Sequence, residues 1–341
     1  MRLGKLPYSI LKRSVWKQTG RAKAPILQGA GAGIDSAALF VSGDVLLTET
    51  TAVLQDEWVL PAMMARLTGD LAAEGGHPVG VEAALTLPES CEEPELRRWM
   101  EQLTKLAEEQ EIQVIGGHTT TLAEVAAPIA TLTMVGGRAA WTPGRIKPGD
   151  QLIVSGWIGM EGMLRILDEK EQELKKRFAP AFINQIRSYR QELFAVRAIS
   201  VAKAEGSSVI RQITEGGIMA ALWNLAKETE TGLELDLKKL SILQETIEVC
   251  EHYRINPYQL TSTGCLLIVT DDGEVLADEL KRNNIQASVI GKTTDDNDKK
   301  LHNGDEVRYI DRPAPDEIFK IYGGIEHGQI KGTDTEIHGE E

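Results

Sequence analysis

Residues 112–137 read IQVIGGHTTTLAEVAAPIATLTMVGG, and this stretch decides the fold of the first half of the chain. Two apolar runs, 112–115 and 128–137, have the composition and length of buried strands. Between them, the polar segment GGHTTT (116–121) follows the first strand directly, and we expect it to be a loop. Because loops after strands commonly carry ligand contacts, Gly117, His118 and Thr119 are candidate site residues.

Strand and helix patterns alternate on both sides of this stretch, which predicts an α/β fold. The segment WTPGRIKPGDQ (141–151) is rich in proline and glycine and gives the best domain boundary. We therefore predict two α/β domains, 1–147 and 148–323, followed by a loose polar tail, 324–341. The predicted strands are 45–51, 79–87, 151–156, 207–213, 233–237, 264–270 and 287–292, and the predicted helices are 7–19, 58–75, 94–111, 160–167, 218–229 and 273–283, with further helices in 169–205.

Composition and charge exclude several classes of protein. The formal charge of −14 argues against a nucleic-acid surface, because phosphate neutralisation needs clustered Lys and Arg. No run of apolar residues is long enough for a membrane span, and the start of the chain lacks an export signal. Three widely separated cysteines indicate neither disulfides nor a zinc site. We expect a cytoplasmic protein.

A glycine-rich segment, QGAGAGIDSAA (28–38), is the first candidate site. Gly29, Gly31 and Gly33 allow the backbone to approach a ligand and to turn its amides toward an anion. Asp35 follows, where a carboxylate could hold a magnesium ion that bridges phosphates. The segment is neither a dinucleotide fingerprint nor a Walker A loop, and an ordinary surface loop is the alternative interpretation.

Other candidates come from acids and from the start of a predicted helix. Glu49 ends a strand, Asp70 lies in a helical stretch, and each could equally be a surface charge. The segment TEGG (214–217) follows a strand and opens a helix, so its amides and the Thr214 hydroxyl could receive a phosphate. Thr214 could equally be a helix N-cap, and His118 a structural hydrogen-bond donor.

The order of these segments resembles the AIR synthetase (PurM-like) superfamily, and within it the hydrogenase-maturation branch. The similarity covers about residues 4–295 and runs through GKLP, GAGIDSAA, LLTETT, LTGDLAAEGGHP, IGGHTTT, IKPGDQLIVSGWIGMEG, ITEGGIMAALWNLA and TSTGCLLIV. It implies a homodimer in which the first domains of two chains form a shared β-barrel, with ATP and Mg²⁺ in a cleft beside it. By position it implies metal-facing acids at Asp35, Glu49 and Asp70, and nucleotide contacts from Gly29, Gly31, Gly33, Gly117, His118, Thr119, Thr214, Gly216 and Gly217.

The chain departs from the family pattern at three places. The family has Asp where this chain has Glu49 and Gln212, and fewer carboxylates mean weaker Mg²⁺ binding. The hydrogenase-maturation branch carries a carbamoyl group on a carboxyl-terminal cysteine, whereas this sequence ends GEE and its last cysteine is Cys265. We therefore expect that this chain does not act as a carbamoyl dehydratase.

Two functions are compatible with these observations. The first is an ATP-dependent enzyme that phosphorylates and so activates an oxygen of a small molecule or protein group. The second is a divergent, non-catalytic dimer that binds a nucleotide or a partner protein. The acceptor substrate does not follow from the sequence, because a fold does not determine a site.

Overall fold

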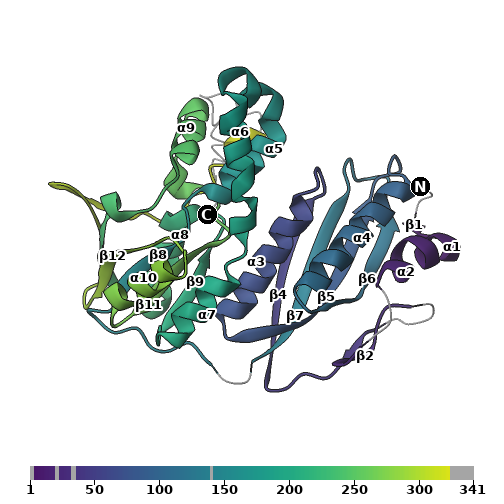
Figure 1. Cartoon of the computed structure of the whole chain (residues 1–341), viewed down its shortest axis with the longest axis horizontal. Helices are drawn as coiled ribbons and strands as arrows, with labels where there is room; N and C mark the ends of the chain where they lie inside the picture. Colours follow the sequence, from purple (N-terminus) through teal and green to yellow (C-terminus); the bar gives the residue numbers. More distant parts are fainter. Residues whose placement is uncertain (1–3, 20–22, 32–35, 139–140, 323–341) are drawn as a thin grey trace, which may run out of the picture.

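The computed structural model describes residues 4–19, 23–31, 36–138 and 141–322, which form two domains, each built on its own β-sheet (Figure 1). The first domain ends with strand β7 (Ile129–Arg138), and the second begins with strand β8 (Gln151–Ser155). Residues 141–150 between them form no helix or strand. The predicted boundary at residue 147 falls within this connection.

The first domain is a mixed sheet with the strand order β1-β6-β5-β7-β4. Strands β5 and β6 run parallel, and the other neighbours are antiparallel. Helices α3 and α4 lie across one face of this sheet (Figure 1). The strands are β1 (Gly4–Lys5), β4 (Asp44–Val53), β5 (Gly76–Leu87), β6 (Gln113–Thr121) and β7, and the helices are α3 (Val59–Ala73) and α4 (Glu93–Glu109).

The helix-covered face of this sheet contains the core of the first domain. Leu67 and Leu71 of α3 and Leu103 of α4 are buried against Leu132 and Met134 of β7. Because side chains alternate along a strand, every second residue of β4, β5 and β7 points toward these helices. Burial of each such side chain contributes about 1.5–3 kcal/mol, so this face determines the register of the sheet.

The opposite face of the first sheet is uncovered in the single chain. Val45 and Leu47 of β4 are 58% and 68% exposed on it, and Glu49 and Thr51 continue the same row of side chains. The exposed face is therefore apolar at one end and polar at the other. The shared β-barrel of a dimer stays a prediction, because it needs a second chain.

A helical segment and a small hairpin lie beside β1 and β6 at one end of the strand order (Figure 1). The segment includes a wider, π-type turn, and Ser14 and Arg13 within it bond to Glu93 of α4. This contact holds the pKa of Glu93 down at about 2, chiefly through the hydrogen bond from Arg13. The elements are α1 (Tyr8–Ile10), η1 (Leu11–Trp16), α2 (Lys17–Thr19), β2 (Ile26–Gln28) and β3 (Ala38–Leu39).

The second domain is built on a sheet with the order β14-β13-β10-β12-β8-β11-β9. Among its described strand pairs, β10 and β13 run parallel and the others antiparallel. Helices α7 and α10 pack on one face and α8 on the other, and α5, α6 and α9 project together at the top of Figure 1. The strands are β8, β9 (Val209–Ile213), β10 (Gly232–Asp236), β11 (Cys265–Thr270), β12 (Ala287–Thr294), β13 (Lys299–Asn303) and β14 (Glu306–Tyr309). The helices are α5 (Met160–Arg177), α6 (Pro180–Ser188), η2 (Tyr189–Leu193), α7 (Val196–Ala204), α8 (Gly217–Thr229), η3 (Leu237–Lys239), α9 (Gln244–Tyr253), η4 (Pro257–Gln259), α10 (Gly273–Arg282) and α11 (Phe319–Tyr322).

The two domains meet along helix α3, which lies beside β9 and α7 of the second domain (Figure 1). Arg211 of β9 bonds to Glu74 at 2.7 Å. The guanidinium of Arg190, which is ion-paired with Asp168, lies 4.3 Å from the ring centroid of Trp58. Charged and aromatic contacts therefore hold α3 against the second domain, together with apolar packing of Ala65, Ala72 and Ala73.

The structure differs from the sequence-based prediction mainly at three places. The segment GGHTTT, predicted to be a loop, continues β6 as a strand, because it stays paired with β5. The hairpin of β13 and β14 and helix α9 were not predicted. The tail 324–341 lies outside the described residues.

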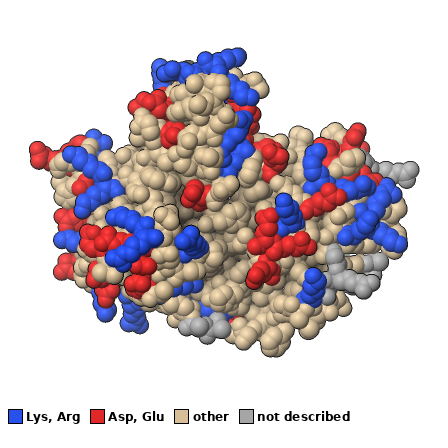
Figure 2. All heavy atoms as spheres, viewed as in Figure 1, with Lys and Arg blue, Asp and Glu red and all other residues tan. Residues whose placement is uncertain are grey.

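Charged side chains of both signs are mixed over the face of the molecule drawn in Figure 2, and no single-sign patch covers that face. None of the helices in the described ranges combines the length and apolar composition needed to cross a membrane.

Candidate functional site

A cavity of about 640 Å³ lies where the uncovered face of the first sheet meets the amino-terminal helical segment. One wall is apolar and aromatic, and the other is formed by glycines and polar side chains. The first wall contains Tyr8, Leu11, Val15 and Trp16; the second contains Gly29, Gly31, Glu82, Gly116, Gly117, His118, Thr119 and Thr133. Its size suits a small-molecule ligand, since such sites commonly have 300–1,000 Å³.

Gly117 gives the cavity its close backbone wall. Its φ of +138° is unfavourable for other residues, and a Cβ at this position would lie 1.9 Å from the carbonyl oxygen of Ala83. The close approach of β6 to β5 here requires glycine. His118 and Gly117 are exposed beside the cavity, whereas Thr119 is buried.

A polar row crosses the uncovered face next to this wall. Glu49, Thr133, Glu82 and Gly116 are paired in register on β4, β7, β5 and β6. The Thr133 hydroxyl donates to Glu49 at 2.9 Å, and a Cβ on Gly116 would lie 2.9 Å from Glu82 Oε1. Glu49 therefore lies in the same row as three residues of the cavity wall, Thr133, Glu82 and Gly116.

Glu82 was missed by the sequence reasoning, although it lines the cavity. The signal was present, because Glu82 is the one charged residue in the run VGVEAALTL (79–87). A charge in an otherwise apolar strand is costly unless it has a partner or a function.

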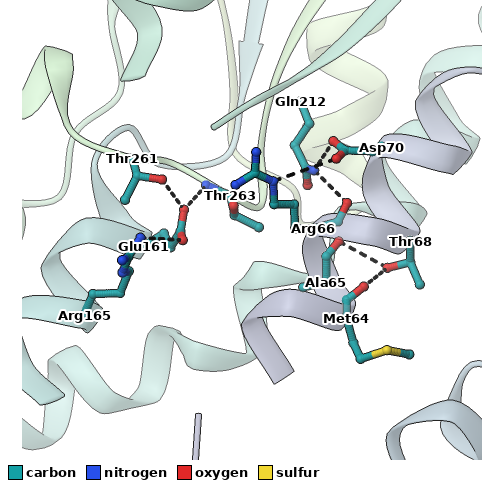
Figure 3. Close-up of polar contacts among 10 residues, drawn as sticks. All are labelled: Met64, Ala65, Arg66, Thr68, Asp70, Glu161, Arg165, Gln212, Thr261 and Thr263. Carbon is teal, nitrogen blue, oxygen red and sulfur yellow. Dashed lines mark hydrogen bonds and ion pairs between the residues drawn. The ribbon is translucent and has the colours of Figure 1, made fainter. Parts of the chain in front are cut away.

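Asp70 lies on the other side of the sheet from Glu49. Asp70 belongs to α3. Thr48, which precedes Glu49 on β4 and points to the helix-covered face, hydrogen-bonds to Asp70. Gln212 of β9 donates to Asp70 at 2.7 Å, and Arg66 Nε lies 3.9 Å from its second oxygen (Figure 3). Burial raises the pKa of Asp70, while Gln212, Arg66 and Thr48 partly oppose that shift.

The segment TEGG lies at the start of α8 and contributes no residue to the cavity wall. The Gly216 amide donates to the Asp316 carboxylate at 2.6 Å. Gly217 is closely surrounded, since a Cβ there would lie 2.6 Å from the carbonyl oxygen of Tyr258. Thr214 accepts the Gly217 amide through its carbonyl oxygen.

The structure thus brings together one part of the predicted site. Gly29, Gly31, Gly117, His118 and Thr119 share the cavity. Asp70 and the TEGG segment lie elsewhere. Gly33 and Asp35 lie outside the described residues, so the predicted set of metal-facing acids stays a prediction.

The surroundings of Asp70 do not fit a divalent cation. Mg²⁺ and Ca²⁺ need several oxygen ligands. Here the carboxylate is engaged by the nitrogen donors of Gln212 and Arg66 and by the Thr48 hydroxyl, and none of these groups is a second carboxylate. Within the described ranges, no group of three or more His, Cys, Asp or Glu side chains could hold a metal ion.

Comparison with known families assigns both halves of the chain. Residues 29–137 match the AIR synthase related protein, N-terminal domain, and residues 147–303 match the AIR synthase related protein, C-terminal domain. The chain belongs to the AIR synthase related family. This confirms the resemblance to the AIR synthetase superfamily found in the sequence, and the similar proteins include hydrogenase-maturation proteins.

Two curated relatives indicate the range of this family. The carbamoyl dehydratase HypE of Rhodobacter capsulatus is 28% identical over 214 residues, which cover 61% of this chain and 60% of the relative. The thiamine-monophosphate kinase of Pyrococcus horikoshii is 23% identical over 219 residues, 62% of this chain and 65% of the relative. The matched stretches thus span about three fifths of each relative's length.

Two solved structures share the fold. The hydrogenase maturation protein HypE in complex with ATP has a TM-score of 0.72 at 16% identity, covering 91% of this chain and 96% of that one. HypE in a HypE–HypF complex has a TM-score of 0.64 at 18% identity, covering 81% and 92%. The two-domain arrangement described above is therefore that of HypE.

Proposed function

We propose that the cavity of the first domain binds ATP. The observation that carries this proposal is the two-sided composition of the cavity. A nucleotide has a flat apolar base and a charged phosphate chain, and the cavity lining contains aromatic side chains as well as glycines and polar groups. The structure of HypE in complex with ATP supports the proposal through the shared fold.

On this proposal, the base lies against Tyr8 and Trp16, whose rings pack edge to face with centroids 5.6 Å apart. The phosphates lie toward Gly29, Gly31 and Gly117, where the absence of side chains lets backbone amides approach them. His118 and the hydroxyl groups of this wall add hydrogen-bond donors.

Glu82 makes the polar wall favour a phosphate chain that carries a bound cation over one that does not. A carboxylate repels a bare phosphate, so the two can be close only if a cation lies between them. Magnesium bound to ATP would supply that charge, and Glu82 and Glu49 are the described acids of this row that would hold it. Asp70 lies on the other face of the sheet and is bonded to Gln212, so it is not part of this group of acids.

The chemistry proposed is ATP-dependent activation of an oxygen of an acceptor by phosphoryl transfer. The protein contributes to such a reaction chiefly by positioning the reactants and stabilising charge. The thiamine-monophosphate kinase relative supports phosphoryl transfer as a reaction that this fold family performs. The acceptor is a small molecule or a group on a protein.

A non-catalytic nucleotide-binding protein is the second candidate function. The pairing of Asp70 with Gln212 favours it, because this carboxylate is already engaged by nitrogen donors. The two candidates differ in turnover but not in binding.

We also propose that two chains associate through the uncovered face of the first sheet, where Val45 and Leu47 are exposed. A further protein partner is part of this proposal, supported by the structure of a HypE–HypF complex. A cytoplasmic location remains the expectation from the sequence.

Calorimetry with ATP, with and without Mg²⁺, tests the binding proposal. Trp16→Leu is expected to weaken binding because it removes the stacking surface, while Trp223→Leu in the second domain serves as the matched control. Equal affinity of both variants, or no binding by the natural protein, contradicts the proposal. Release of ADP in the presence of Mg²⁺ would support the ATP-dependent enzyme, whereas binding without ADP release would support the non-catalytic protein.

A further inference from the structure

Asp70 and Gln212 form a direct contact between the two domains. Asp70 lies near the end of α3, and Gln212 reaches it from β9 (Figure 3). Arg66 lies one turn before Asp70 on the same helix, so both α3 residues face Gln212.

The side-chain amide of Gln212 is fully used as a donor. Its nitrogen donates to Asp70 Oδ1 at 2.7 Å and to the carbonyl oxygen of Arg66 at 3.0 Å. A primary amide has two hydrogens, and each has an acceptor here. Both acceptors belong to the first domain and the donor to the second.

Gly69 provides the space for this contact. A Cβ at Gly69 would lie 2.4 Å from Gln212 Oε1 and 2.9 Å from its carbonyl carbon. The amide therefore lies flat against bare helix backbone. The Oε1 atom is buried and accepts no hydrogen bond from the described residues.

The orientation of the amide is fixed by its surroundings. Turning it over would place Oε1 against the Asp70 carboxylate and the Arg66 carbonyl, so three acceptors would face one another and the amide would donate to neither partner. Such unpaired buried polar groups cost about 1–3 kcal/mol each. An inverted amide would need a cation among the three oxygens, whereas the observed orientation needs none.

We propose that Asp70, Gln212 and Arg66 form a metal-free lock between the two domains. The amide of Gln212 occupies the place that a cation would take beside Asp70, and Arg66 balances its negative charge. The lock fixes α3 against β9 without a divalent ion, and it operates whether or not a nucleotide is bound in the cavity.

Thermal unfolding and calorimetry with MgCl₂ alone, without nucleotide, test the lock. The natural protein is expected to show no Mg²⁺-dependent rise in melting temperature up to about 10 mM, above the roughly 1 mM Kd of weak oxygen sites. Gln212→Asp places a second carboxylate opposite Asp70 and is expected to gain such a rise. Gln212→Ala, which adds no carboxylate, is the matched control and should not gain it.

Variants of Asp70 test the hydrogen bonds themselves. Asp70→Ala is expected to lower the melting temperature in EDTA, whereas Asp70→Asn should lower it less, because an Asn oxygen still accepts from Gln212. If calorimetry detects a heat of Mg²⁺ binding to the natural protein, and Asp70→Asn abolishes that heat, the lock is overturned. Equal melting temperatures for the natural protein, Asp70→Asn and Gln212→Ala would overturn it as well. Neither outcome depends on ATP binding, so the lock and the proposed function can fail separately.

Discussion

The backbone amide of Gly216 donates a hydrogen bond to the carboxylate of Asp316, with 2.6 Å between nitrogen and oxygen. Asp316 is 3% exposed and accepts a second hydrogen bond from the Ile318 amide at 2.9 Å. The start of α8, predicted as a phosphate contact, thus already holds an anion that belongs to the chain itself. A phosphate could take this position only after Asp316 leaves it.

Asp316→Ala is expected to destabilise the second domain by about 2–4 kcal/mol, because it leaves the backbone amides of Gly216, Thr261 and Ile318 without this acceptor. Denaturant unfolding measures the loss. Asp311→Ala, which changes an exposed residue in the same segment, is the control. A midpoint equal to that of the control would show that the contact contributes nothing.

The same carboxylate predicts a pH dependence of stability. Burial raises the pKa of Asp316 above its ordinary value near 4, although three backbone hydrogen bonds oppose the shift. The folded protein then binds this proton more tightly than the unfolded chain, so the free energy of unfolding falls as pH rises from about 4 through the folded pKa. Asp316→Asn should remove this part of the pH dependence. An unchanged slope in unfolding experiments between pH 4 and 7 would contradict it.

Gly117→Ala is expected to destabilise the first domain by roughly 2–5 kcal/mol and to disrupt the cavity wall. The added Cβ meets the Ala83 carbonyl at 1.9 Å, and φ is +138°. Gly149→Ala is the matched control, since Gly149 also has a positive φ, +96°, but no atom within 4 Å of the added carbon. Thermal unfolding of both variants checks the prediction. Equal losses would mean that backbone strain alone, and not the close approach to β5, requires glycine.

Much of the fold follows from local patterns in the sequence. Apolar runs predicted the strands of the first sheet, and the structure buries one face of these strands under α3 and α4. The hairpin of β13 and β14 was missed although Asn303 and Gly304 form a turn signal, since its strands are polar: all of β14 is exposed. The strand through GGHTTT was missed because two glycines usually interrupt a strand, whereas here they allow close packing on β5.

The candidate site could be predicted only in part. Gly29, Gly31 and His118 meet in one cavity, as their positions after turns and strands indicated. Glu49 is separated from Asp70 because the Glu49 side chain points to the uncovered face of the sheet, whereas α3, which carries Asp70, lies on the other face and packs beside β9. Those relations involve contacts far apart in sequence, so no local pattern contains them.

Glu82→Gln is expected to change how ATP binding depends on magnesium. Removing the carboxylate reduces repulsion of the phosphates, so binding without Mg²⁺ should strengthen, by up to about tenfold for 1.4 kcal/mol. The gain from added Mg²⁺ should shrink correspondingly. Calorimetry in EDTA and in Mg²⁺ measures both, with the exposed Glu124→Gln as control. An unchanged ratio of the two affinities would exclude Glu82 from the phosphate region.

Leu47→Glu is expected to dissociate the proposed dimer, because it places a charge in the exposed apolar end of the first sheet. Val275→Glu changes a residue of similar exposure, 51% against 68%, on α10 of the second domain and should have no effect. Sedimentation at micromolar concentration distinguishes the outcomes. A monomeric natural protein, or a dimer that survives Leu47→Glu and is lost with Val275→Glu, would contradict association through this face.

The final prediction concerns the thiols of this chain. Cys91, Cys250 and Cys265 are all buried. Burial raises the pKa of Cys91 to about 11 and that of Cys250 to about 12, and it raises the pKa of Cys265 further. A cysteine acts as a nucleophile through its thiolate, so none of the three should carry a group transferred during a reaction at neutral pH.

Iodoacetamide at pH 8 should therefore leave the native protein unmodified, whereas the protein unfolded in guanidinium should gain three adducts, one for each cysteine in the sequence. Intact-mass measurement counts the adducts. The variant Ser200→Cys, at an exposed position, supplies a reactive control thiol in the native protein. Rapid modification of Cys91, Cys250 or Cys265 in the folded protein would refute the prediction. Because cysteine reactivity requires both access and ionisation, such a result would also show that the modified thiol is reachable from solvent.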